Sequence, residues 1–261
     1  MRRRPAFVAA AVVLAAACGG NKPPSLLPEG PPVERMTLLA IDSTWNRAVR
    51  EFRAGKWKSA SEQFEKAMRQ LPASDPRAQR AHFFIGECRM GEGDFLQAAR
   101  EFRRVADESP DFTLAADALQ RTGDAYRELW RRPELDPTYG QTALATYQEV
   151  ASRFPGSAAA GRAQGAIREL EDWFAYKQYK AARFYLRLRA YDSAIIYLKD
   201  IVATYPRSAV APEALVHLAD VYRTLEYVED LKETCGYMRR FHAGAKGVEK
   251  ACRDVPPVAG S

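Results

Sequence analysis

The chain has 261 residues and a formal net charge of +6, with 47% hydrophobic and 28% charged residues. Arg2, Arg3 and Arg4 lie in a segment that we expect to be removed, which leaves 36 basic against 33 acidic side chains. This near balance gives no indication of nucleic-acid binding through a basic stripe. The composition is otherwise that of one or two compact domains or one elongated array.

Residues 1–17 have the pattern of a bacterial secretory signal peptide. Three arginines precede a short uncharged apolar run, and small residues lead up to Cys18. The run is too short to span a bilayer, which needs about 20 apolar residues. A cysteine at this place resembles the lipobox of bacterial lipoproteins, which implies cleavage before Cys18 and its acylation. The alternative is an ordinary cleaved signal with a chance cysteine.

The segment 18–40 is expected to be the acylated cysteine followed by a tether. Residues 19–33 read GGNKPPSLLPEGPPV, are rich in Pro and Gly, and show no periodicity. Gly19, and not Asp, follows the cysteine, which in enteric lipoproteins directs the chain to the outer membrane. We therefore expect a protein that is lipid-anchored at the periplasmic face of the outer membrane.

An internal repeat is the most informative feature of the chain. Segments 55–72 and 93–110 match position by position at a distance of 38 residues. They share a Gly, an aromatic residue, a small Ala, a Phe, a smaller apolar residue and a Pro. The matching pairs are Gly55 and Gly93, Trp57 and Phe95, Ala60 and Ala98, Phe64 and Phe102, Ala67 and Val105, and Pro72 and Pro110. Two further copies end at Pro155 and Pro206, and a degenerate fifth spans 212–241.

The chemistry of these positions predicts pairs of packed helices. Glycine allows the left-handed backbone that ends the first helix, the small Ala lets the two helices approach, and Pro stops the second helix. The pattern resembles the tetratricopeptide repeat. We expect an all-α fold, a superhelical array of about five tetratricopeptide-like helix pairs over residues 41–242, followed by a C-terminal tail, 243–261. Two irregularities stand out, an insertion at 131–140 and a long helix from about 157 to 188.

The cysteines beyond Cys18 have different expected roles. Cys88 lies in a helical pattern, where a small core residue is the simplest interpretation. Cys235 and Cys252 lie 17 residues apart in a chain expected to be exported, so they could form a disulfide. The spacing leaves the pairing open, because it does not show whether the two Cα atoms approach closely enough.

The sequence offers no pattern typical of an enzyme or a metal site. Its three histidines, His82, His217 and His242, are far apart, with no HExxH motif and no Gly-rich phosphate loop. His242 with Cys235 and Cys252 matches no zinc-site spacing and lacks a fourth ligand. We expect no catalysis, no metal and no cofactor.

Several features together resemble the BamD (ComL) lipoprotein family of the outer-membrane β-barrel assembly machinery. They are the lipobox, the Pro-rich tether, five repeats, the insertion with its DPT segment at 136–138, and FYLRLRAYDSAIIYLKDIVATYPRS at 184–208. The resemblance covers roughly residues 40–242. Where the family reads FY-x-KRGAY, this chain has Arg187 at the Lys, Leu188 at the Arg and Arg189 at the Gly.

This resemblance implies a scaffold with two kinds of partner. The N-terminal repeats would bind unfolded outer-membrane proteins in a concave pocket, although some of the pocket residues could instead pack against the neighbouring helix. The expected substrate-binding residues are Trp45, Val49, Phe52, Phe83, Glu87 and Met90. The C-terminal repeats would dock on a periplasmic domain of the β-barrel assembly subunit. Their guanidinium groups favour carboxylates of a folded domain, and the expected residues are Arg183, Arg187, Arg189, Arg239 and Arg240. The alternative function is an adaptor lipoprotein for another cell-envelope complex, such as peptidoglycan or envelope-integrity machinery.

Overall fold

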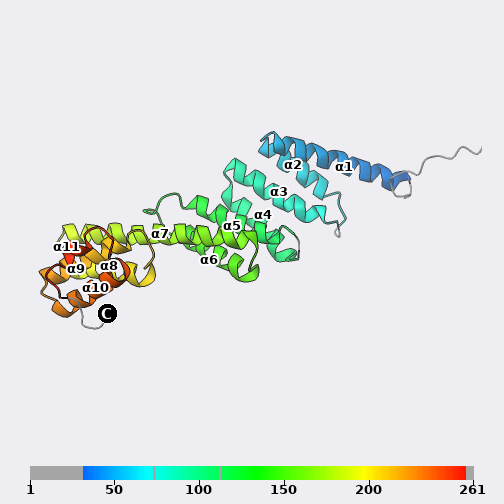
Figure 1. Ribbon diagram of the computed structural model, residues 1–261. Helices are drawn as coiled ribbons and strands as arrows, with labels where there is room; N and C mark the ends of the chain where they lie inside the picture. Colours follow the sequence, from blue (N-terminus) through cyan, green and yellow to red (C-terminus); the bar gives the residue numbers. More distant parts are fainter. Residues whose placement is uncertain (1–31, 73–74, 112, 257–261) are drawn as a thin grey trace, which may run out of the picture. The chain divides into compact units, whose positions relative to one another are not determined.

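The computed structural model of the chain describes residues 32–72, 75–111 and 113–256 (Figure 1). The expected signal peptide, Cys18 and the first part of the expected tether lie outside these residues. Within them the chain forms helices and no strand. The helices are α1 (Pro32–Arg53), α2 (Trp57–Met68), α3 (Arg77–Glu92), α4 (Phe95–Glu108), α5 (Ala115–Leu129), α6 (Thr138–Arg153), α7 (Ala158–Arg187), α8 (Tyr191–Thr204), α9 (Ala211–Thr224), α10 (Val228–Phe241) and α11 (Val248–Ala251).

Helix α1 begins earlier than the repeat pattern suggested. It starts at Pro32, so that residues 32–40 are helical although they fall within the stretch expected to be a tether. Proline suits the first position of a helix because its N–H would have no partner there and its φ is already helical. No Gly or Pro follows until Gly55, so nothing in the sequence interrupts the helix. Residues up to Ala40 form a unit separate from the compact unit that begins at Ile41.

The compact unit is an array of helix pairs, which confirms the predicted all-α fold. From α2 to α10 each helix packs against the next one along the chain (Figure 1). The small alanine of the repeat stands at the same distance before the closing proline in all four copies, and it is completely buried in each, as Ala60, Ala98, Ala143 and Ala194. The glycines that open the first two copies, Gly55 and Gly93, have φ values of 70° and 79°. The repeat positions therefore have the roles in helix packing and termination that the sequence indicated.

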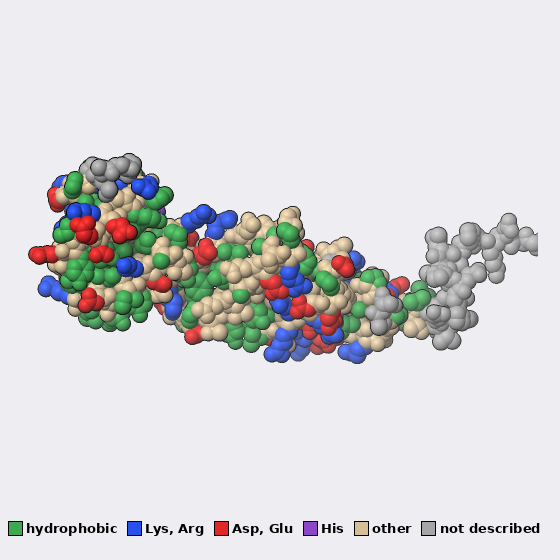
Figure 2. Space-filling view, turned by 90° about the horizontal axis from the view of Figure 1, so that it is seen from below, with side chains coloured by type: hydrophobic (Ala, Val, Ile, Leu, Met, Phe, Trp, Pro, Cys, Tyr) green, Lys and Arg blue, Asp and Glu red, His purple; other side chains and the backbone are tan. Residues whose placement is uncertain are grey.

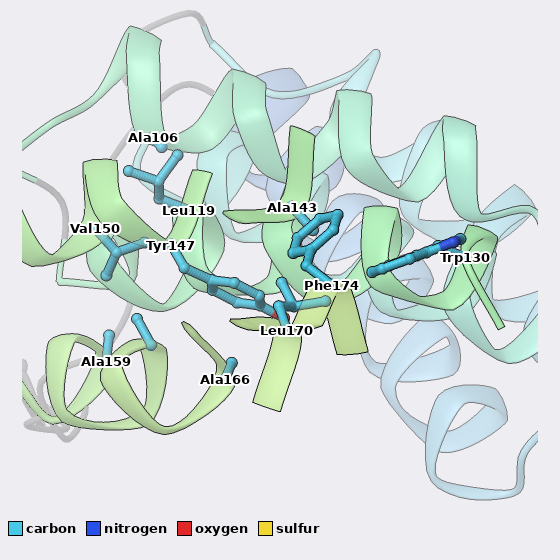
Figure 3. Packing of buried hydrophobic residues seen from close by; sticks show 11 residues of the cluster. Ala106, Leu119, Trp130, Ala143, Tyr147, Val150, Ala159, Ala166, Leu170 and Phe174 are labelled. Atoms are coloured by element: carbon cyan, nitrogen blue, oxygen red, sulfur yellow. The ribbon is translucent and has the colours of Figure 1, made fainter. Parts of the chain in front are cut away.

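The long helix α7 connects two parts of the core. Ser157 caps its first turn, since its Oγ accepts a hydrogen bond from the Ala160 backbone N–H at 3.1 Å. The first half of α7 packs with α5 and α6 in a cluster that includes Tyr147, Leu170 and Phe174 (Figure 3). Its second half packs with α8 and α9. One helix of 30 residues can serve both clusters because it is about twice as long as its neighbours.

The C-terminal segment is part of the fold. Residues 243–256 do not form the expected tail, because α11 lies in this segment and packs against α9 and α10. Val248 and Ala251, three residues apart on one face of α11, are buried in one cluster with residues of these two helices, and Val255, which follows α11, is buried in the same cluster. A disulfide joins Cys235 of α10 to Cys252, with the Cα atoms 5.6 Å apart. The folded region therefore extends beyond the boundary at residue 242.

Cys88 differs from this pair because it is a free, completely buried thiol. Burial, with a further contribution from the nearby Glu92 carboxylate, raises the pKa of Cys88 to about 12. Only the thiolate reacts rapidly with alkylating reagents. We expect iodoacetamide at pH 8 to leave Cys88 unmodified in the folded protein and to modify it in urea, as measured by intact mass. Rapid modification under native conditions would contradict the buried position.

Candidate binding surfaces

The residues expected to bind substrate fall into two neighbouring clusters. Trp45, Val49 and Phe52 of α1 are half-buried and pack on a core that includes Phe64. Ring contacts hold this group together, with centroids 5.3 Å apart for Trp45 and Phe64. Phe84 of α3 lies 5.2 Å from Phe52 and stacks on Phe64 at 5.1 Å. Sequence reasoning missed Phe84, although an aromatic residue directly after Phe83 was the available signal.

Phe83 and Met90 belong to the second cluster. Both are half-buried and pack against the core between α4 and α5. The Phe83 ring lies 5.4 Å from the completely buried Phe102 ring in an edge-to-face arrangement. These two residues therefore combine a packing role with a partly exposed apolar surface, as do the three residues of α1. Such a surface suits the apolar side chains of an extended polypeptide.

Glu87 does not act as a free carboxylate in this surface. Its two oxygens accept hydrogen bonds from Nε and Nη2 of Arg121, both at 2.6 Å, which joins α3 to α5. Arg121 also donates from Nη1 to Asp124 at 3.0 Å. Burial would lower the pKa of Arg121, but its hydrogen bonds to the two carboxylates outweigh this and raise it. The charge of Glu87 is therefore already paired within the array, and its binding of substrate stays a prediction.

Asp124 is the centre of a polar network that the sequence did not reveal. It accepts hydrogen bonds from Gln120 at 2.8 Å and from the Tyr147 hydroxyl at 2.7 Å. Burial and the adjacent Asp124 carboxylate raise the pKa of Tyr147, so its hydroxyl stays protonated and donates. Arg162 of α7 donates to Gln120 Oε1 at 3.2 Å. The network thus ties α5, α6 and α7 together and is structural.

The arginines expected to bind a partner do not all have the same role. Arg183 and Arg187 are exposed on the last turns of α7, and Arg187 lies over the Phe184 ring at 6.0 Å. Arg240 on α10 is exposed as well. Arg239 is engaged within the fold, since its Nη2 donates to the carbonyls of Cys252 at 2.7 Å and Val255 at 2.6 Å. The structure therefore assigns Arg239 to holding the C-terminal segment.

Arg189 lies between α7 and α8, two residues before Tyr191, where the first two repeats have glycine. Its backbone has the same left-handed conformation, with a φ of 56°. This costs a non-glycine residue about 1 kcal/mol. The Arg189 side chain is exposed, and so is that of the preceding residue, Leu188, which is 61% exposed. The segment 173–191 contains five cationic and no acidic residues, which makes this end of α7 basic and apolar together.

Charges of both signs are mixed on one face of the described molecule. On the face drawn in Figure 2, basic and acidic side chains alternate with hydrophobic patches. None of the helices described in the structure is both long and apolar enough to cross a membrane.

Comparison with known proteins identifies the family. Residues 41–235 match the sequence profile of YfiO, described as outer membrane lipoprotein. The outer membrane protein assembly factor BamD of Caulobacter vibrioides is 27% identical over 233 residues, which cover 88% of this chain and 73% of that protein. The BamD of Neisseria gonorrhoeae is 29% identical over 140 residues, which cover 50% of this chain and 52% of that protein.

A solved structure of a TPR repeats protein from Bacteroides fragilis is also similar, with a TM-score of 0.48 and 14% identity, over 82% of this chain and 96% of that one. The family match spans the helix pairs from the second half of α1 to α10. This family match confirms the resemblance noted from the sequence. The chain therefore belongs to the YfiO family of outer membrane lipoproteins.

Proposed function

We propose that this protein is a non-catalytic scaffold, lipid-anchored through Cys18 at the periplasmic face of the outer membrane, that assists the assembly and insertion of β-barrel outer-membrane proteins. The observation that carries the proposal is the family match over residues 41–235, which includes nearly the whole helix-pair array. Relatives of this family are named as outer membrane protein assembly factors. A scaffold of this kind needs binding surfaces and no reactive centre.

Two chemically different surfaces support two partners. The first, the α1–α3 surface, consists of Trp45, Val49, Phe52, Phe83 and Met90, which are half-buried and apolar. It would bind extended segments of unfolded outer-membrane proteins. The second, the α7 basic surface, consists of Arg183, Arg187 and Arg189, which are exposed. It would bind carboxylates on a periplasmic domain of the β-barrel assembly subunit, with Arg240 contributing from α10.

We expect the two surfaces to be separable by mutation. Charge reversal of Arg187 and Arg189 to Glu should weaken binding of the assembly subunit's periplasmic domain at least about tenfold, because attraction becomes repulsion. Binding of a peptide from the C-terminus of a β-barrel protein should stay unchanged. Phe83→Ala should do the opposite. Titration calorimetry with each ligand measures both effects, and higher salt should weaken only the arginine-dependent contact.

Two controls make this experiment specific. Arg100→Glu reverses an exposed arginine on α4, outside both surfaces, and should leave both ligands bound. Because Phe83 packs against Phe102, circular dichroism must show that Phe83→Ala is folded. Equal weakening of both ligands by each variant would indicate a single shared groove and contradict the assignment of two surfaces.

The anchor is tested separately through Cys18. We expect Cys18→Ala to move the exported protein from the membrane fraction to the periplasmic fraction, because one or more acyl chains are lost. Its helical content should be unchanged, since the compact unit begins only at Ile41. Immunoblotting of the fractions, in cells that lack the assembly subunit, provides the measurement. Membrane association of Cys18→Ala in such cells would refute the lipid anchor.

A further inference from the structure

The turns that follow α7 and α9 lie next to each other at one edge of the array. Each turn has three residues, 188–190 and 225–227, and the connection 205–210 between α8 and α9 is short as well, so consecutive helices run in opposite directions. Helices α7 and α9 therefore run in the same direction. The Tyr179 hydroxyl lies 3.0 Å from Nε2 of His217, and these residues precede the ends of α7 and α9 by eight and seven residues. The ends of the two helices are therefore level, and residues 188–190 and 225–228 form what we call the α7–α9 edge.

A charged residue occupies the left-handed backbone position in both turns of this edge. Arg189 and Glu226, each the second residue after its helix, have φ values of 56° and 62°. Gly55 has the same position after α1, and the three turns close with the same two backbone hydrogen bonds. Glycine adopts this conformation with less strain than any other residue. Helix termination therefore does not account for the two charged side chains.

The two charges are available to another molecule. The side chains of Arg189 and Glu226 are both exposed, and neither forms an ion pair or a hydrogen bond with the residues that the structure describes. Their neighbour Glu229 differs, because it pairs with Lys232 at 2.9 Å. The edge thus presents a free cation on one turn and a free anion on the other.

Exposed apolar side chains lie directly beside both charges. Leu188 precedes Arg189 and is 61% exposed, and Tyr227 and Val228 follow Glu226 and are 44% and 55% exposed. Apolar groups that are exposed together, with charges at their margin, are typical of a protein interface. A second protein is therefore a better fit to this edge than a small polar ligand.

The α7–α9 edge is complementary to itself. A two-fold axis between the turns places 188–190 of one copy against 225–227 of the other, and the same contact then forms twice. Arg189 faces Glu226 of the second copy, and Leu188 faces Tyr227. A purely acidic or purely basic partner, or an anionic membrane surface, would meet repulsion at one of the two turns. The charge pattern therefore favours a second copy.

We propose that two copies of the chain pair through the α7–α9 edge. The interface is small, so the dimer is weak, with a Kd on the order of 100 μM in solution. Lipid anchors confine the copies to one membrane and raise their effective concentration. Because Arg189 also belongs to the α7 basic surface, pairing blocks binding of the assembly subunit there. This consequence rests on the proposed function, whereas the pairing itself does not.

Charge swapping tests the pairing. Sedimentation velocity of the full chain carrying Cys18→Ala, between about 10 and 500 μM, should show a monomer–dimer equilibrium. Arg189→Glu and Glu226→Arg should each weaken it at least about tenfold, because each reversal acts at both contacts of the dimer. The variant with both substitutions should regain the wild-type Kd within about threefold, since the swapped charges are again complementary. Arg100→Glu, an exposed change on α4, is the matched control and should have no effect.

Cross-linking tests the two-fold arrangement. A mixture of chains with Leu188→Cys and chains with Tyr227→Cys should form a disulfide-linked dimer on mild oxidation, because these two positions face each other. Either variant alone should form much less. Cys88 is buried and Cys235 is bridged to Cys252, so they do not compete. Equal cross-linking of the single variants and the mixture would contradict the two-fold arrangement.

The outcomes also separate this inference from the proposed function. A wild-type chain that stays monomeric over the whole concentration range, or a doubly swapped variant that does not regain the dimer, would overturn the pairing. Loss of assembly-subunit binding on reversal of Arg187 and Arg189 would still support the partner contact in either case. If the dimer forms and is swapped as expected, but this reversal leaves subunit binding unchanged, the pairing stands and the partner contact fails.

Discussion

Replacing Gly123 with alanine is expected to lower the free energy of unfolding by about 1 to 2 kcal/mol. Alanine normally stabilises a helix interior by about 0.5 to 1 kcal/mol relative to glycine. At position 123, however, an added Cβ would lie 2.6 Å from Cε1 of Tyr147. The Tyr147 ring is completely buried, and its hydroxyl donates to Asp124 at 2.7 Å, so it cannot easily move aside. Overpacking costs about 1 to 3 kcal/mol and outweighs the gain in helix propensity.

The matched control is Gly165→Ala in α7, where an added Cβ would meet only the end of the Arg168 side chain at 4.0 Å. This variant should be more stable than the wild-type chain by about 0.5 to 1 kcal/mol. Urea denaturation followed by circular dichroism measures both variants. Both variants replace a helical glycine with alanine, so opposite signs of the change in the free energy of unfolding would show that packing at position 123 decides the result. A gain in stability for Gly123→Ala would mean that α5 and α6 are packed less closely at this point.

Loss of the Cys235–Cys252 disulfide should loosen the C-terminal segment by about 3 kcal/mol. This is the loop-entropy stabilisation of a cross-link that closes a loop of roughly this length, and the two residues are separated by 17 positions. We expect amide exchange in residues 248–255 to accelerate by about a hundredfold in the double variant Cys235→Ala and Cys252→Ala, while exchange in α2 to α5 stays the same. Hydrogen–deuterium exchange mass spectrometry measures this difference.

Reduction of the wild-type chain with dithiothreitol should reproduce the effect, and the double variant should not respond to the reductant. Cys88 does not interfere with this test, because it forms no disulfide and is buried in α3, far in sequence from the C-terminal segment. If exchange near Val248 is unchanged in both cases, then packing of Val248, Ala251 and Val255 and the hydrogen bonds from Arg239 suffice to hold the segment.

The sequence by itself determined the helix pairs, the register of the repeat, the long helix α7 and the family. These features depend on local chemistry. Glycine at a left-handed position, a small residue at a close helix contact and proline after a helix have the same effect in every copy, so comparison of the copies reveals them. Gly55, Gly93 and the four buried alanines have the conformations and burial that the pattern indicated.

Only the tertiary structure decided which polar side chains are already engaged. Glu87 and Arg121 are 34 residues apart, and Arg239 reaches carbonyls 13 and 16 residues away, so no local pattern connects these partners. Trp130 is similar, because the sequence shows an aromatic residue before a loop but not that its ring is buried and its N–H lacks a partner among the described residues. Contacts between different helices depend on the angle and offset at which the pairs stack. The repeat pattern does not determine this angle and offset, because many different side chains can occupy the same position between two packed helices.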